Sequence, residues 1–173
     1  MSSILKVDTI QNTGGTTGLT IDNSGRVFQP AKPAWRIGRG SDLAVTSGQG
    51  ATTNLDFDLT SDTATRCFVQ GCTVNSGAIT VPTSGLYHVG TSVRLDNIGG
   101  GYAVVHIRMN NDSSSLFGTY NIRGEPDSNY FTLADSTVFK LNANDVIRVS
   151  YYASSDSSFT VDQRSYFWGY LVG

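Results

Sequence analysis

The sequence has few charged residues: Asp, Glu, Lys and Arg make up only 15% of its 173 residues, against about a quarter in an ordinary soluble domain. Its 12 cationic and 14 acidic side chains leave a formal net charge of −2. It therefore lacks the basic excess that binds nucleic acid, and we expect no nucleic-acid partner. With so little charge, we expect part of the surface to be covered by other subunits.

Long apolar runs are also missing. No stretch approaches the roughly 20 apolar residues that span a membrane, and Met1–Lys6 lacks the apolar core of a signal peptide. We therefore expect no membrane insertion and synthesis in a cytoplasm, with release only by another route, such as inside a particle freed by lysis.

The two cysteines, Cys67 and Cys72, are too few for a disulfide framework. At this spacing they would point to opposite faces of a regular strand, so a bridge would need a turn at Gln70–Gly71. We expect two free thiols in a reducing compartment, with a disulfide as the alternative. No further Cys or His lies close enough in sequence to complete a metal site.

Histidine is equally scarce. His88 and His106 both fall in strand-like runs, on the faces opposite the expected core, so we expect exposed or interfacial side chains. The sequence contains no phosphate-binding loop and no His-Glu-x-x-His motif. A nucleophile held beside a base is not apparent either. We expect no enzymatic activity, and a glycan-cleaving fibre enzyme is a disfavoured alternative.

Glycine, serine and threonine are abundant, and they separate short runs of alternating apolar and polar residues. Residues 77–95 show this best, with two strands joined by a turn at Pro82–Gly85. We expect Pro82 to fix the first corner of the turn and Gly85 to adopt a positive φ. Similar runs occur at 34–38, 55–59, 102–109, 136–141, 146–152 and 166–172. With no helical period, the pattern predicts an all-β sandwich or barrel.

Period-two alternation also predicts which residues form the core. In the strand after the turn, one face is apolar and the other carries His88, Gly90, Ser92 and Arg94. The expected core comprises Trp35, Tyr87, Val89, Val93, Phe139, Phe167, Gly169 and Leu171.

The last strand is apolar on both faces, so we expect both to be buried. We expect Phe167 and Leu171 inside the sandwich, with Gly169 allowing the facing sheet to approach. Tyr166, Trp168 and Tyr170 would then face neighbouring subunits as a trimer interface, because aromatic side chains favour interface centres. The alternative is that Trp168 covers a loop of its own chain.

Residues 1–32 contain shorter alternating runs than residues 33–173, and we expect them to form a separate β-rich leader. Its strands are short and interrupted by Gly-rich turns, and the Pro-containing stretch 29–33 forms an extended joint to the head. Strands this short cannot bury a core alone. The leader should therefore pair with something else, most simply with copies of itself.

The leader motifs Leu-x-Val-Asp-Thr-Ile at 5–10 and Leu-Thr-Ile-Asp-x-Ser-Gly-Arg-Val at 19–27 resemble the N-terminal segments of fibre and appendage proteins of tailed phages, especially those of marine cyanobacteria. An ordinary β-meander leader is the alternative. The resemblance implies that residues 1–32 anchor the chain to other virion proteins.

The head carries four separated motifs: Pro33-Ala-Trp35, Gly77-x-Ile-x-Val-Pro-x-x-Gly-Leu-Tyr87, Leu141-x-x-x-Asp145-x-Ile147 and Tyr166-Phe-x-Gly-x-Leu-Val172. In this order they resemble the globular head of the complement q subunit, sister to the tumour necrosis factor ligands. The resemblance implies a ten-strand jelly-roll sandwich and a threefold homotrimer. The chain departs from the family at Asn144-Asp145, where Gly-Asp is usual, and in having no collagen-like stalk.

Together the resemblances imply a non-enzymatic, homotrimeric virion protein on a phage tail or capsid surface. Its head would attach to a host-surface glycan or protein through loops that contain Tyr102, Asp112, Ser114 and Asp156. A capsid decoration protein or capsid fibre is the main alternative, and a non-viral glycan- or protein-binding head is less favoured. Some heads of this family bind calcium, so Asn110–Asp112 and Asp127 are candidate ligands; no other cofactor is expected.

Overall fold

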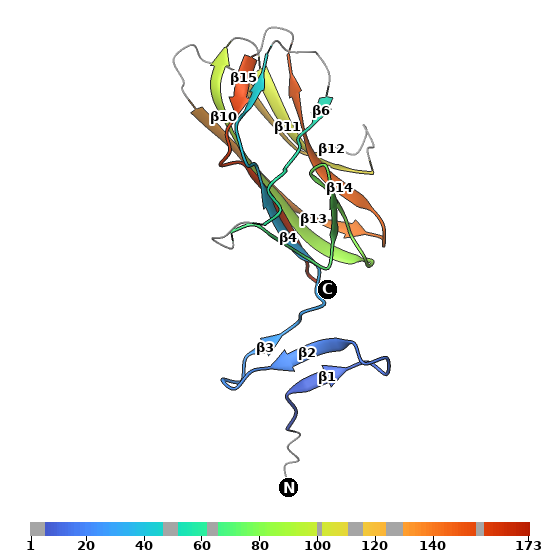
Figure 1. Ribbon diagram of the computed structural model, residues 1–173. Coiled ribbons are helices and arrows are strands. Elements are labelled where there is room, and N and C mark those ends of the chain that lie inside the picture. Colours follow the sequence, from blue (N-terminus) through green and yellow to red (C-terminus); the bar gives the residue numbers. More distant parts are fainter. Residues whose placement is uncertain are drawn as a thin grey trace. The chain divides into compact units, whose positions relative to one another are not determined.

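The computed structural model describes residues 6–46, 52–61, 66–99, 102–110, 116–123, 130–154 and 158–173; residues 98, 99 and 116–123 are described for their backbone only. The chain divides into two compact units, Met1–Lys32 and Pro33–Gly173 (Figure 1). Within the described residues, no helix has the length and apolar character needed to cross a membrane.

The first unit is an antiparallel sheet of three short strands, β1 (Thr9–Gln11), β2 (Thr17–Ile21) and β3 (Val27–Phe28). The turn between β2 and β3 is fixed by Asp22, whose Oδ1 accepts hydrogen bonds from the backbone N–H groups of Ser24 and Arg26 at 2.9 Å. No described side chain in 6–32 is buried. This small sheet therefore has no core of its own.

The second unit is a sandwich of two sheets in which every described strand pair is antiparallel. The seven-stranded sheet contains β4 (Ala34–Gly38), β5 (Leu43–Val45), β7 (Phe68–Gln70), β10 (Gly85–Gly99), β13 (Tyr130–Leu141), β15 (Ser158–Val161) and β16 (Tyr166–Leu171). The six-stranded sheet contains β6 (Thr52–Asn54), β8 (Thr73–Asn75), β9 (Ala78–Thr80), β11 (Tyr102–Met109), β12 (Leu116–Arg123) and β14 (Val146–Ala153). The long strand β10 pairs with β13, β15 and β16 and so organises its sheet.

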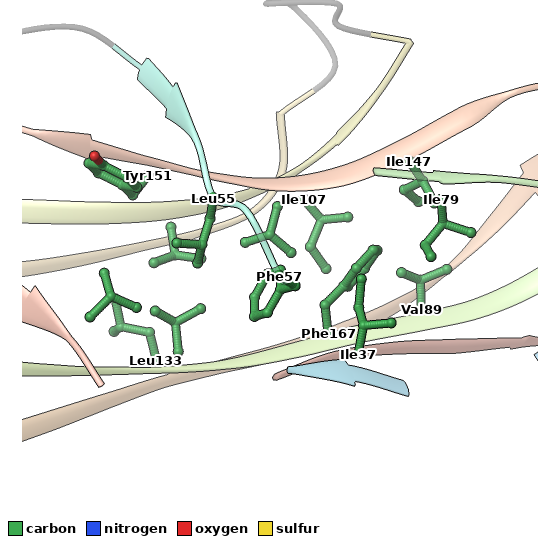
Figure 2. Packing of buried hydrophobic residues seen from close by; sticks show 14 of the residues in the cluster. Ile37, Leu55, Phe57, Ile79, Val89, Ile107, Leu133, Ile147, Tyr151 and Phe167 are labelled. Atoms are coloured by element: carbon green, nitrogen blue, oxygen red, sulfur yellow. The ribbon is translucent and has the colours of Figure 1, made fainter. Parts of the chain in front are cut away.

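The core lies between the two sheets, and side chains of both sheets meet there (Figure 2). Trp35 of β4 packs against Tyr87 of β10 and edge-on against Phe167 of β16, with ring centroids 6.3 and 5.7 Å apart. Of the residues assigned to the core from sequence, these three are fully buried, as are Val89, Val93 and Gly169. Phe139 is also buried, and the partly buried Leu171 packs against the core.

The all-β fold class expected from the sequence is confirmed, although the sandwich has more strands than the ten expected. The additional strands are short pieces at sheet margins, such as β5 and β8. The alternation at 55–59 predicts burial but not a strand: Leu55 and Phe57 are fully buried, yet residues 55–58 form no regular strand. The Leu55 N–H instead donates to the Val149 carbonyl at 2.9 Å.

Two glycine expectations were wrong. Gly85 does not adopt a positive φ but begins β10 in an extended conformation. Gly169 makes room within its own sheet rather than for the facing one: a Cβ there would lie 2.4 Å from Cζ2 of Trp35 on the adjacent strand β4. The glycine is therefore needed so that the Trp35 indole can lie flat in the core.

Candidate functional site: the outer face of the seven-stranded sheet

The side of the seven-stranded sheet that points away from the core carries the residues assigned to a trimer interface. Strand register sets them in rows across β4, β16, β10 and β13. One row runs Arg36, Trp168, Gly90, Ser136, and the next runs Ala34, Tyr170, His88, Val138. Tyr166 pairs with Ser92 in the third row. We call this surface the outer face.

Trp168 lies flat over Gly90, and this contact shapes the centre of the outer face. A Cβ at Gly90 would come within 2.3 Å of the indole Cζ2. Tyr170 stacks on the same indole, with the ring planes only 16° apart and the centroids 6.3 Å apart. Trp168 is therefore held by the backbone of β10 and by its own strand, and no loop residue is needed to hold it.

His88 completes this aromatic group. Its ring stands edge-on to Trp168, with centroids 5.0 Å apart, and its Nδ1 is within hydrogen-bond distance, 3.1 Å, of the Tyr170 hydroxyl. The three side chains are mutually fixed, which lowers the rotamer entropy lost when a partner covers them. No carboxylate is among the described contacts of the His88 ring.

Exposed apolar side chains are gathered on this face. Tyr170 is 42% exposed and Val138 55% exposed, although both are large apolar residues in regular strands. By strand register, the same face also carries exposed Phe68, Leu86 and Tyr130. Among the described side chains of the six-stranded sheet, only Tyr102 is comparable. Most of the exposed large apolar side chains in the described strands of the second unit therefore lie on the outer face.

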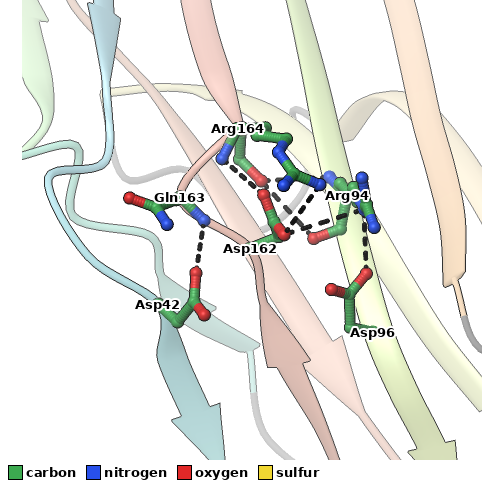
Figure 3. Close-up of polar contacts among 7 residues, drawn as sticks. Asp42, Arg94, Asp96, Asp162, Gln163 and Arg164 are labelled. Carbon is green, nitrogen blue, oxygen red and sulfur yellow. Dashed lines mark hydrogen bonds and ion pairs between the residues drawn. The ribbon is translucent and has the colours of Figure 1, made fainter.

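Two arginines of the outer face lie against its aromatic side chains. The guanidinium of Arg36 lies over the Tyr166 ring, 4.4 Å from its centroid, and that of Arg94 lies over Tyr130 at 4.3 Å. Arg94 is also paired with Asp96 at 3.0 Å and with Asp162 at 3.7 Å (Figure 3).

Of the residues expected in receptor-facing loops, the structure describes only Tyr102. Tyr102 lies in a strand, as the first residue of β11, and stacks on Tyr152 of β14 with centroids 5.7 Å apart. Asp112, Ser114 and Asp156 lie outside the described residues.

The structure describes only part of the proposed calcium sites. Asn110 is engaged by the fold: its side chain donates to Asp145 at 2.9 Å and accepts from the Val146 N–H at 2.8 Å. Asp112 and Asp127 lie outside the described residues. Among the residues that are described, no group of three His, Cys, Asp or Glu is placed to hold a metal ion.

The expectation of an exposed or interfacial His106 was wrong. The residue is only 6% exposed and lies opposite Ser150 of β14 in the six-stranded sheet. Burial, together with the positive charge of Arg108, lowers the pKa of His106 below its ordinary value of 6.5. Within the part of the chain that the structure describes, neither its Nδ1 nor the Oγ of Ser150, its register partner on β14, has a hydrogen-bond partner. They therefore do not form a base–nucleophile pair.

The fold defined by these sheets is a jelly roll of the tumour necrosis factor type, as the comparison with solved structures shows. A crystal structure of murine APRIL at pH 5.0 superposes with a TM-score of 0.59 over 82% of this chain and 99% of that chain, at 11% identity. A second structure of murine APRIL, at pH 8.0, gives the same TM-score and coverage at 9% identity. Identities this low show a shared fold and nothing more. No protein-family profile and no curated protein sequence matches this chain.

Proposed function

We propose that this chain is a non-enzymatic structural protein of a tailed phage virion, which forms a homotrimer and presents its jelly-roll head for attachment to the host surface. The observation that carries the proposal is the outer face, where apolar side chains in rigid strands remain exposed in the single chain. The phage assignment itself rests on the leader motifs of the sequence.

Self-association is the simplest way to cover the outer face. Its centre, formed by Trp168, Tyr170 and His88, is aromatic and carries no described carboxylate, which suits an interface core. Side chains that are already fixed by mutual stacking lose little entropy on association. Three copies would also present three receptor surfaces together, so that weak single contacts add up to tight attachment.

The leader supports attachment to a particle. Ile10, Val27 and Phe28 are each about half exposed, on a sheet too small to bury them. A partner that covers this sheet would stabilise it, and we propose that other virion proteins supply that partner, with the neighbouring leaders of the trimer contributing.

Light scattering on the full-length chain tests the assembly step. We expect a particle of three times the 18.5 kDa chain mass. The double variant Val138→Glu/Tyr170→Glu should yield monomers with unchanged far-UV circular dichroism, since both side chains are exposed in the single chain. Tyr102→Glu, on the opposite sheet, is the matched control and should remain trimeric. A monomeric wild-type protein would overturn the proposal of a trimer.

Immunogold labelling tests the virion assignment, using particles from cultures that produce the protein. Label at the tail tip or fibres supports attachment to the host. Label spread over the capsid supports the decoration protein instead, and unlabelled particles would remove the virion assignment altogether.

A further inference from the structure

The small sheet of the leader gathers its aliphatic side chains on one of its two faces. The register between β1 and β2 places Ile10 opposite Leu19, and the register between β2 and β3 places Ile21 opposite Val27. Leu19 and Ile21 are two residues apart on β2, so their side chains point to the same side of the sheet. All four therefore lie together on one side, which we call the aliphatic face.

The other side of the same sheet differs in chemistry. Thr20 of β2 lies opposite Thr9 on β1 and opposite Phe28 on β3. The guanidinium of Arg26 lies 5.9 Å from the centre of the Phe28 ring, and Arg26 also forms an ion pair with Asp22 at 2.6 Å. We call this side the threonine face. The leader thus presents one aliphatic surface and one surface of mixed polar and aromatic character.

The aliphatic face is formed in the single chain but is not covered there. Ile10 is 47% exposed and Val27 59% exposed. The two turns that shape the sheet are fixed by Asn12 and Asp22, whose side-chain oxygens accept hydrogen bonds from backbone N–H groups at 2.9 Å. Because the sheet is pre-organised in this way, covering its aliphatic face needs little further ordering of the chain.

The composition of the strands favours copies of the leader as the cover. None of the residues in β1, β2 and β3 is charged. Identical aliphatic faces can therefore meet without burying an unpaired charge, which would be costly. Selection of a foreign partner needs polar or charged groups that disfavour the wrong one, and the four aliphatic side chains supply none.

The short connection to the head brings such copies together. Only residues 29–33 separate β3 from β4, so each leader of the proposed trimer is tethered within about 20 Å of its own head. Tethers this short give an effective concentration on the order of millimolar, at which weak apolar contacts are enough. Three such sheets can close a three-sided prism with every aliphatic face turned inward.

We propose that the three leaders of one trimer pack their aliphatic faces against one another. The threonine faces then remain outside, where the virion proteins of the proposed function can make contact with them. The inference rests on the proposed homotrimer and deepens it, because it assigns separate roles to the two faces of the leader.

Hydrogen exchange in the full-length protein, followed by mass spectrometry, tests this packing. The matched variants are Ile21→Asn on the aliphatic face and Thr20→Asn on the threonine face, each replacing a half-buried β-branched residue of β2. We expect the β2 amides to exchange about tenfold faster in Ile21→Asn, because a polar side chain then enters the apolar contact. In Thr20→Asn the change should stay below about twofold, as for a surface substitution. Equal effects of the two variants would overturn the assignment of the faces.

Cross-linking tests whether the cover is another copy of the chain. Ile21→Cys and Thr20→Cys are each combined with Cys67→Ala and Cys72→Ala, and the purified proteins are treated with a short bismaleimide. We expect cross-linked dimers from Ile21→Cys and few from Thr20→Cys. No cross-link from Ile21→Cys would mean that another protein covers the aliphatic face, and would overturn the proposal.

Light scattering on the wild-type protein separates the two levels of the argument. A trimer in which neither exchange nor cross-linking distinguishes the two faces would overturn only the packing of the leaders. A monomer would overturn the proposed homotrimer itself, and the packing of the leaders with it.

Discussion

Trp168 lies flat over Gly90 on the adjacent strand, so that the centre of the outer face depends on the missing side chain of one residue. A valine at position 90 would place its Cβ 2.3 Å from the indole Cζ2 and would force the ring away. We expect Gly90→Val to cost about 1–3 kcal/mol, as overpacking does, and to reduce the trimer fraction in light scattering. Gly18→Val in β2 is the control, because its Cβ would meet only the Ile10 carbonyl at 3.7 Å. A trimer that tolerates both changes would place the interface elsewhere.

Substitution of Phe57 tests whether an irregular segment can be part of the core. It is fully buried and its ring lies 6.1 Å from that of Phe167, although residues 55–58 form no strand. We expect Phe57→Ala to lower the free energy of unfolding by about 3–5 kcal/mol in urea titration. The exposed Tyr102→Ala should lose at most about 1.5 kcal/mol, the value of its ring contact. Similar losses in the two variants would mean that the 55–58 segment is not anchored in the core.

The sequence predicts which side of a strand faces the core better than it predicts sites that several strands build together. Period-two alternation in β10 and β16 is a local property, so it was enough to separate Tyr87 and Phe167 from His88 and Trp168. The burial of His106 was missed because it depends on neighbouring strands, among them β14, whose Ser150 lies opposite it. Arg39, Arg66 and Arg164 likewise show no common pattern in the sequence, and only the fold brings them around one hollow.

Buried His106 should make stability depend on pH. Its folded-state pKa is lowered by burial and by Arg108, so below its ordinary value of 6.5 the unfolded chain takes up a proton that the folded chain resists. Stability is therefore complete above pH 6.5 and falls as the pH drops from 6.5 toward the folded pKa, by up to about 1.4 kcal/mol per pH unit. We expect wild type to lose more unfolding free energy than His106→Leu between pH 7.5 and 5.5. Carboxylate titration cancels in this comparison, and parallel losses would show that His106 is not the group responsible.

We expect the thiol of Cys72 to react slowly with alkylating reagents. It is half-buried at the edge of a surface hollow, it forms no disulfide in the structure, and burial raises the pKa of Cys72 to about 11. Because only the thiolate reacts, alkylation of Cys72 at pH 8 should be about a hundredfold slower than that of a free cysteine. In Cys67→Ala, iodoacetamide labelling followed by mass spectrometry should speed up about tenfold per pH unit between pH 8 and 10. A rate that levels off near the ordinary pKa of 9.0 would contradict this burial. In wild type, labelling that appears only after reduction would instead reveal a Cys67–Cys72 disulfide.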